Sequence, residues 1–157
     1  MQGIIGVKSG FTTAAGGCDV VAVIRTVHGK SVLLLAAVTG QTGPVVLAQA
    51  GLHALALVDA LGPLIGSTQV LPGNHVVAHV SEAGSRLGVT TSSSVSMLTW
   101  PGVSATRVFV PAGHIADQAR RGTRVGTVVV TVGAQRVDVP VRLGGDIPPQ
   151  TLLQRLF

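Results

Sequence analysis

The chain has 157 residues, of which 46% are hydrophobic and only 11% are charged, so it can bury a core and is not a disordered tail. Aromatic residues make up 3% and tyrosine is absent, so packing must come from small and β-branched side chains, which favour strands. A net charge of +5 permits anionic partners, but the arginines are scattered and no aromatic residues interleave with them, which argues against nucleic-acid binding.

The first block, residues 1–66, has the pattern of an antiparallel meander followed by a helix. Runs rich in Val, Ile and Leu predict strands from Gly3 to Gly10, Asp19 to Thr26 and Ser31 to Thr39. Pro44 suits the first position of a helix, and a Gly-Pro pair at 62–63 ends it. One face of this helix is expected to pack on the sheet, with apolar positions at Leu47, Leu52, Leu55, Val58 and Leu61.

From Ser67 onward the pattern changes to short strands separated by turns, which predicts a small, separate all-β sandwich over residues 67–157. Residues 150–157 are expected to form a final turn or short helix. The predicted strands run over Val76 to Val80, Gly88 to Thr91, Val95 to Trp100, Ala105 to Val110, Val125 to Val132 and Arg136 to Leu143.

The sequence predicts no metal site, cofactor, signal peptide or membrane span in these residues, and it leaves membrane attachment open. No basic-then-apolar leader opens the chain, and no apolar run reaches the roughly 18 residues that a span needs. Cys18 is the only cysteine and is expected to be a small buried core residue. Among five dispersed histidines only His75 and His79 are expected to share a strand face, and no third metal ligand can be assigned.

The most informative stretch runs from Gly6 to Cys18 and contains Lys8-Ser9-Gly10 followed by Phe-Thr-Thr-Ala-Ala-Gly-Gly-Cys. A Lys-Ser/Thr-Gly triplet at a strand end is one of three motifs of serine penicillin-binding proteins and β-lactamases. With its flanks, two strands and helix, the region resembles D-alanyl-D-alanine carboxypeptidases of the low-molecular-mass penicillin-binding class. The resemblance is strong through residue 62, and beyond it the order of β segments is similar to that family's C-terminal β-domain.

This resemblance implies an α+β fold: a partial penicillin-binding/β-lactamase-like transpeptidase fold over residues 1–66, then a β-rich C-terminal domain over residues 67–157. It also implies that Lys8, Ser9 and Gly10 bind substrate. An ammonium and a hydroxyl suit the carboxylate of a D-alanine terminus, and glycine lets an extended peptide lie against the strand edge. The backbone N–H of Phe11 would supply half of an oxyanion hole.

The family's two other motifs are missing from the sequence. The nucleophile and its base occur as Ser-x-x-Lys, but the residues three positions before Lys8 and Lys30 are isoleucine and valine. The Ser-x-Asn motif fails as well, because the only asparagine, Asn74, follows Pro72 at that offset. An acyl-enzyme mechanism needs an activated hydroxyl beside a base, so no catalytic nucleophile is assigned and the chain alone is expected to be inactive.

By the family's topology, the strand at 31–39 would pair with a strand outside these residues, and further helices would cover one sheet face. We therefore expect an open edge and an exposed face, and we do not expect a natural domain boundary at Met1. The leading hypothesis is a partial serine-type D-Ala-D-Ala carboxypeptidase of peptidoglycan processing, extracytoplasmic in its complete form. Its partners would be a peptidoglycan stem peptide, a β-lactam and the missing N-terminal portion. A non-enzymatic cell-envelope interaction module and an anion-binding β protein stay open as alternatives.

Overall fold

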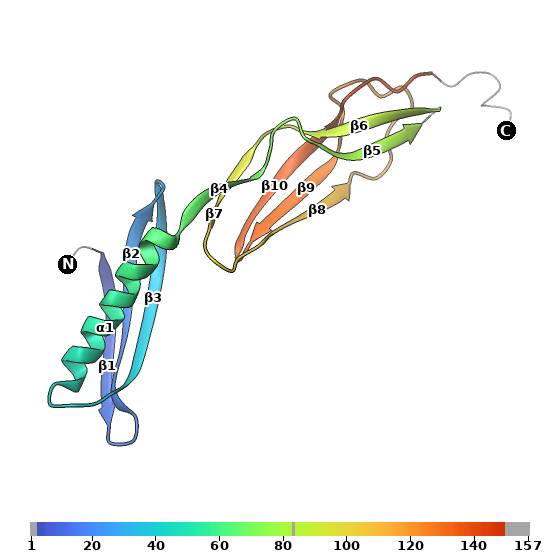
Figure 1. Ribbon diagram of the computed structural model, residues 1–157. Helices are drawn as coiled ribbons and strands as arrows, with labels where there is room; N and C mark the ends of the chain where they lie inside the picture. Colours follow the sequence, from blue (N-terminus) through green and yellow to red (C-terminus); the bar gives the residue numbers. More distant parts are fainter. Residues whose placement is uncertain (1–2, 83, 150–157) are drawn as a thin grey trace. The chain divides into compact units, whose positions relative to one another are not determined.

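The computed structural model describes residues 3–82 and 84–149 and divides into two compact units, Met1–Gly66 and Ser67–Phe157 (Figure 1). The described part contains one α-helix and ten strands, with antiparallel pairs in both units. The mostly-β character predicted from composition is therefore confirmed. The short C-terminal element expected over residues 150–157 lies outside the described residues.

The first unit holds a three-stranded antiparallel meander, as predicted. Its strands are β1 (Ile4–Thr12), β2 (Gly16–Val27) and β3 (Lys30–Gln41), in the order β1-β2-β3. Each strand is longer than the sequence pattern indicated. The β2–β3 turn is only two residues long, because His28 and Gly29 both have positive φ, 48° and 74°, as a tight hairpin requires.

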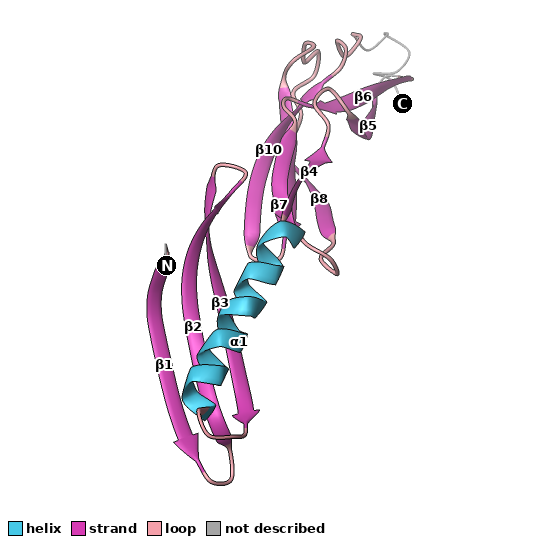
Figure 2. Ribbon diagram, turned by 60° about the vertical axis from the view of Figure 1, so that its left-hand side comes forward, coloured by secondary structure: helices cyan, strands magenta, loops and turns pink. Residues whose placement is uncertain are grey.

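One face of this sheet is covered by helix α1 (Val46–Leu61), which is followed by a short 3-10 helix, η1 (Gly62–Leu64). Figure 2 shows α1 lying along the sheet. The helix begins after Val45, so Pro44 precedes the helix instead of opening it. Its buried residues are Ala50, Ala54 and Val58, and the last two share a core with Val21, Val23, Leu34 and Ala36 of the sheet.

The leucine stripe that we expected to face the sheet is mostly exposed, and Leu52 keeps 66% of its surface. The packing face of α1 consists of small side chains because the helix lies very close to the sheet. A Cβ placed on Gly17 of β2 would come 2.5 Å from the carbonyl oxygen of Val46. Within the helix, a Cβ on Gly51 would come 2.8 Å from a carboxylate oxygen of Asp19. Of the five positions expected on the packing face, Val58 is buried and Leu55 packs partly against the core, whereas the other three leucines stay exposed.

The opposite face of the sheet carries a row of exposed apolar side chains. The β2–β3 register pairs Ile24 with Leu33 and Ala22 with Leu35, so these side chains point away from α1. Leu33 and Leu35 keep 54% and 63% of their surface. We call the residues Val20, Ala22, Ile24, Leu33 and Leu35 the open face. β3 is an edge strand, as we expected from the sequence.

Helices α1 and η1 together form an apolar segment, Val46–Leu64, that is long enough to cross a membrane by length and composition alone. We did not expect such a segment from the sequence. In the first unit its Ala50, Ala54 and Val58 side chains are fully buried against the sheet.

The second unit is built only from strands in its described part. A five-stranded antiparallel sheet has the order β5-β6-β10-β9-β8, and a two-stranded ribbon pairs β4 with β7. Both contribute to one core that includes Leu71, Met97, Val130, Val141 and Leu143. The strands are β4 (Gly66–Leu71), β5 (Val76–Glu82), β6 (Ser85–Thr91), β7 (Val95–Thr99), β8 (Ala105–Pro111), β9 (Arg124–Val132) and β10 (Gln135–Leu143).

Strand β4 is the element that the sequence did not predict. Its residues Ser67, Thr68 and Gln69 show no apolar alternation, and burial begins only at Val70 and Leu71. The strand forms because it pairs with β7, where the hydroxyls of Thr68 and Thr99 lie 2.7 Å apart. The described part of the second unit thus has one five-stranded sheet and a two-stranded ribbon, where a sandwich was expected.

The two units can be followed separately in solution. Trp100, the only tryptophan of the sequence, lies in the second unit, whereas the one α-helix of the described residues lies in the first. The helical circular dichroism signal therefore reports unfolding of the first unit, and tryptophan fluorescence reports the second.

We expect Gly17→Ala to lower the free energy of unfolding of the first unit by about 1–3 kcal/mol, because the added methyl meets the backbone of α1. Gly10→Ala is the matched control, since a Cβ at Gly10 has nothing within 4 Å. The control should leave stability unchanged or raise it by up to about 1 kcal/mol. Urea unfolding followed by circular dichroism measures both, and equal effects of the two changes would contradict the close packing of α1.

Asp19 is a second test of this packing, because it is only 5% exposed and its Oδ1 has no hydrogen-bond partner among the described residues. A buried carboxylate without a partner is destabilising. We expect Asp19→Val, which keeps the side-chain shape, to raise the free energy of unfolding by about 1–3 kcal/mol. Asp59→Val, which removes an exposed carboxylate 3.0 Å from Arg25, should give no such gain. A loss of stability in Asp19→Val would show that the carboxylate has a stabilising partner.

Candidate functional site

The Lys8-Ser9-Gly10 triplet lies within β1, the outer strand of the first unit's meander. Its residues pair in register with β2: Lys8 opposite Val20, Ser9 opposite Asp19 and Gly10 opposite Cys18. The sequence pattern predicted that the triplet ends the strand. The strand continues to Thr12, so the triplet lies inside it. β1 pairs with β2 alone, which leaves its other side as a free sheet edge in the described structure.

Neighbouring residues of the triplet point to opposite faces of the sheet, because side chains alternate along a strand. Lys8 and Gly10 share the face of Val20, which is the open face. Ser9 points to the face that carries α1, where Asp19 lies opposite. One ligand can therefore meet the Lys8 ammonium and the Ser9 hydroxyl together only at the edge of β1.

The edge around the triplet has room for a ligand. Within residues 3–82 and 84–149, Lys8 is exposed and makes no ion pair or side-chain hydrogen bond. A Cβ built on Gly10 meets nothing within 4 Å. Phe11, next in the strand, keeps 56% of its surface. An unpaired ammonium beside apolar side chains and an empty glycine position suits an anionic group that arrives from solvent.

The backbone of β1 adds donors at the same edge. In an antiparallel edge strand, every second residue directs its N–H and C=O away from the neighbouring strand. Ser9 and Phe11 are two residues apart, so their N–H groups point in the same direction. The N–H and C=O groups of β1 that point away from β2 can form hydrogen bonds with an extended peptide.

The segment that follows the triplet forms the β1–β2 turn. The Ala15 N–H donates to the Thr12 hydroxyl at 3.0 Å, and the Ala15 carbonyl accepts from the Gly40 N–H at 3.0 Å. Gly16 has a φ of 68° and closely approaches the backbone of Gln41. These contacts hold the turn after β1 against the end of β3, so the Thr-Thr-Ala-Ala-Gly run is a fixed turn.

Cys18 is half-buried and points to the open face beside Gly10, so the expectation of a buried core cysteine was wrong. The strand alternation explains the difference, because the buried positions of β2 are the odd-numbered residues around it. The Cys18 thiol lies 3.6 Å from the carbonyl oxygen of Ala15.

The histidines do not form a cluster in the described structure. His75 precedes β5 and His79 lies within it, so the two do not share a strand face as expected. The His53 ring nitrogen Nδ1 lies 2.7 Å from the side-chain oxygen of Gln41. No three His, Cys, Asp or Glu side chains among the described residues are arranged to hold a metal ion.

No protein-family model matches the chain, and no curated protein matches it. Among solved structures, the chain is similar to the D-alanyl-D-alanine carboxypeptidase DacD from Francisella tularensis, with 19% sequence identity and a TM-score of 0.48. The alignment covers 96% of this chain and 37% of that protein. The chain therefore spans little more than a third of the length of that solved structure.

Proposed function

We propose that the chain is part of a serine-type D-Ala-D-Ala carboxypeptidase of peptidoglycan processing, a penicillin-binding protein. In this proposal residues 1–66 are the C-terminal part of the catalytic domain, and residues 67–157 are its β-rich C-terminal domain. The complete protein would act outside the cytoplasm. Its substrate would be a peptidoglycan stem peptide, and a β-lactam would bind in the same place.

The observation that carries the proposal is the position of the motif on a free strand edge. Lys8, Ser9 and Gly10 would receive a substrate that lies along β1, where Gly10 leaves space for its backbone. The Lys8 ammonium would pair with the terminal carboxylate, and the Ser9 hydroxyl would donate to it. The Phe11 N–H would stabilise negative charge on the attacked carbonyl oxygen.

The reactive half of the site would come from a second polypeptide segment that covers the open face. Lys8 shares this face with Val20 and the exposed leucines of β3, so a segment packed there would stand beside the ammonium. Burial of these apolar side chains would supply the driving force for association. The segment would carry the Ser-x-x-Lys and Ser-x-Asn motifs that this sequence lacks.

The proposal predicts that a fluorescent penicillin does not label the purified chain covalently, because no serine stands beside a base as Ser-x-x-Lys. When the chain is mixed with the N-terminal part of a complete carboxypeptidase, we expect a complex and a labelled serine on that added part. Lys8→Gln should slow this acylation at least about tenfold, since it removes a charge-assisted hydrogen bond.

Lys30→Gln is the matched control, because Lys30 is the only other lysine and lies at the β2–β3 turn. It should leave the acylation rate unchanged. Labelling of the chain alone would contradict the assignment of a missing nucleophile. Equal rates for Lys8→Gln and the unchanged chain would contradict the role of Lys8, and failure to form a complex would contradict docking on the open face.

A non-enzymatic cell-envelope interaction module is the second candidate. The observation that favours it is the second unit, which has a complete core of its own in its described part and carries none of the family's motifs. In that case the Lys8 triplet would be vestigial. A mixture that forms a stable complex without any acylation would support this candidate.

A further inference from the structure

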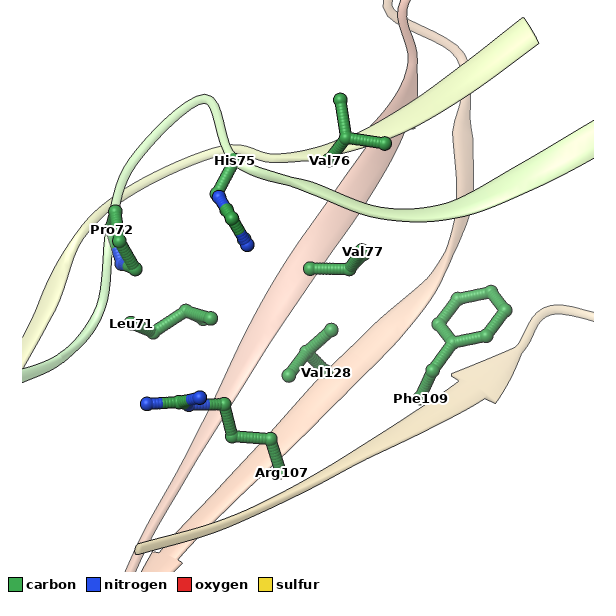
Figure 3. Close-up of a pocket in the computed structure, with 8 residues that line it drawn as sticks. All are labelled: Leu71, Pro72, His75, Val76, Val77, Arg107, Phe109 and Val128. Atoms are coloured by element: carbon green, nitrogen blue, oxygen red, sulfur yellow. The ribbon is translucent and has the colours of Figure 1, made fainter.

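The second unit contains a cavity of about 270 Å³ that the sequence motifs do not involve. It is lined by residues of both edge strands of the five-stranded sheet, β5 and β8, and it is open to solvent, since His75, Val76 and Arg107 are exposed. Figure 3 shows the side chains around it. The lining residues are Leu71, Pro72, His75, Val76, Val77, Arg107, Phe109 and Val128.

Two polar side chains point into this cavity from opposite walls. Arg107 of β8 donates from Nε to the carbonyl oxygen of Val70 at 2.6 Å, which holds its guanidinium beside the buried end of β4. Its two terminal nitrogens make no further hydrogen bond with the described residues. In Figure 3 the ring of His75 reaches into the cavity from the turn before β5. No Asp or Glu is among the lining residues, so the polar end of the cavity attracts an anion.

The turn that carries His75 is fixed by a single buried side chain, Thr91. The Thr91 hydroxyl donates to the carbonyl oxygen of Pro72 at 2.7 Å and accepts from the N–H of His75 at 3.0 Å. The backbone of Thr91 also accepts from Asn74 and donates to His75, both at 3.0 Å. Because the two contacts that His75 makes with Thr91 use only its backbone, its ring is left for a ligand on a turn that is already ordered.

The remaining wall of the cavity is apolar. Leu71 and Val128 belong to the buried core, and Val77 packs partly against that core. The ring of Phe109 stands at the other end of the close-up from His75 (Figure 3). A pocket with an apolar wall and a few convergent polar groups is the usual arrangement of a small-molecule site.

We propose that this cavity binds a small carboxylate that carries a short branched apolar group. The carboxylate would lie between Arg107 and His75, and the apolar group would contact Val77, Val128 and Phe109. The volume is below the roughly 300–1,000 Å³ of sites for drug-sized molecules, which limits the ligand to a short chain. This binding is independent of the Lys8 site, which lies in the other unit.

The probe is 4-methylpentanoate, added to the whole chain and followed by two-dimensional amide NMR. We expect saturable shifts confined to residues that line the cavity, with a dissociation constant on the order of 1 mM. N-acetyl-leucine carries the same branched apolar group beside the carboxylate of a peptide terminus. If it binds more tightly than 4-methylpentanoate, the ligand is a peptide end; if it binds more weakly, the ligand is a free acid. The neutral amide of the probe should bind at least about tenfold more weakly.

Two variants with matched controls make the proposal falsifiable. Arg107→Gln should weaken binding at least about tenfold, whereas Arg136→Gln, on an exposed position of β10, should not. His75→Ala removes only the ring and keeps the backbone contacts to Thr91, so it should also weaken binding. Its control, His79→Ala, should leave the affinity unchanged. Tryptophan fluorescence confirms that each variant is folded. Equal affinity for the acid and its amide, or unchanged affinity in Arg107→Gln, would overturn the proposal.

Discussion

The three-stranded sheet of the first unit buries only one of its two faces, and the rest of that unit depends on how tightly this face is packed. Helix α1 approaches so closely that glycine and alanine occupy the contact, as Gly17, Ala50 and Ala54 do. Small side chains bury little area each, so the stability of this layer comes from close contact over its whole length. The leucines of α1 are left on its surface, where they add apolar area to a unit that already has an open face.

The same one-sided packing determines what the Lys8 segment can do. An edge strand offers backbone donors, a glycine without neighbours and an ammonium without a partner among the described residues, but it offers no wall opposite them. A groove needs two sides, and catalysis needs donors held at fixed distances from the reacting atoms. The strand can therefore position an extended anion, while the chemistry depends on what packs against the open face.

The strand pattern of the sequence found strands with regular burial, and it also found β1 and β8, whose residues are almost all exposed. β2, β9 and β10 alternate between buried and exposed residues, and the strand pattern found each of them. It missed β4, because Ser67, Thr68 and Gln69 carry no alternation and the strand exists only through its partner. The expected helix face was correct at Val58 and Leu55 and wrong at the other three leucines, because the close approach of the layers favours alanine at Ala50 and Ala54. The Lys8-Ser9-Gly10 triplet could be found as a local motif. That Lys8 and Ser9 point to opposite faces of the sheet is shown only by the pairing of β1 with β2.

The cavity of the second unit could not be found from the sequence for a related reason. His75 and Arg107 are distant in the chain and belong to opposite ends of the strand order, so no local pattern joins them. They line one pocket, in which Thr91 fixes the turn before β5 and the Val70 carbonyl holds the guanidinium of Arg107 on β8. The pocket therefore follows from the strand order and from these two contacts, none of which a local sequence pattern reveals.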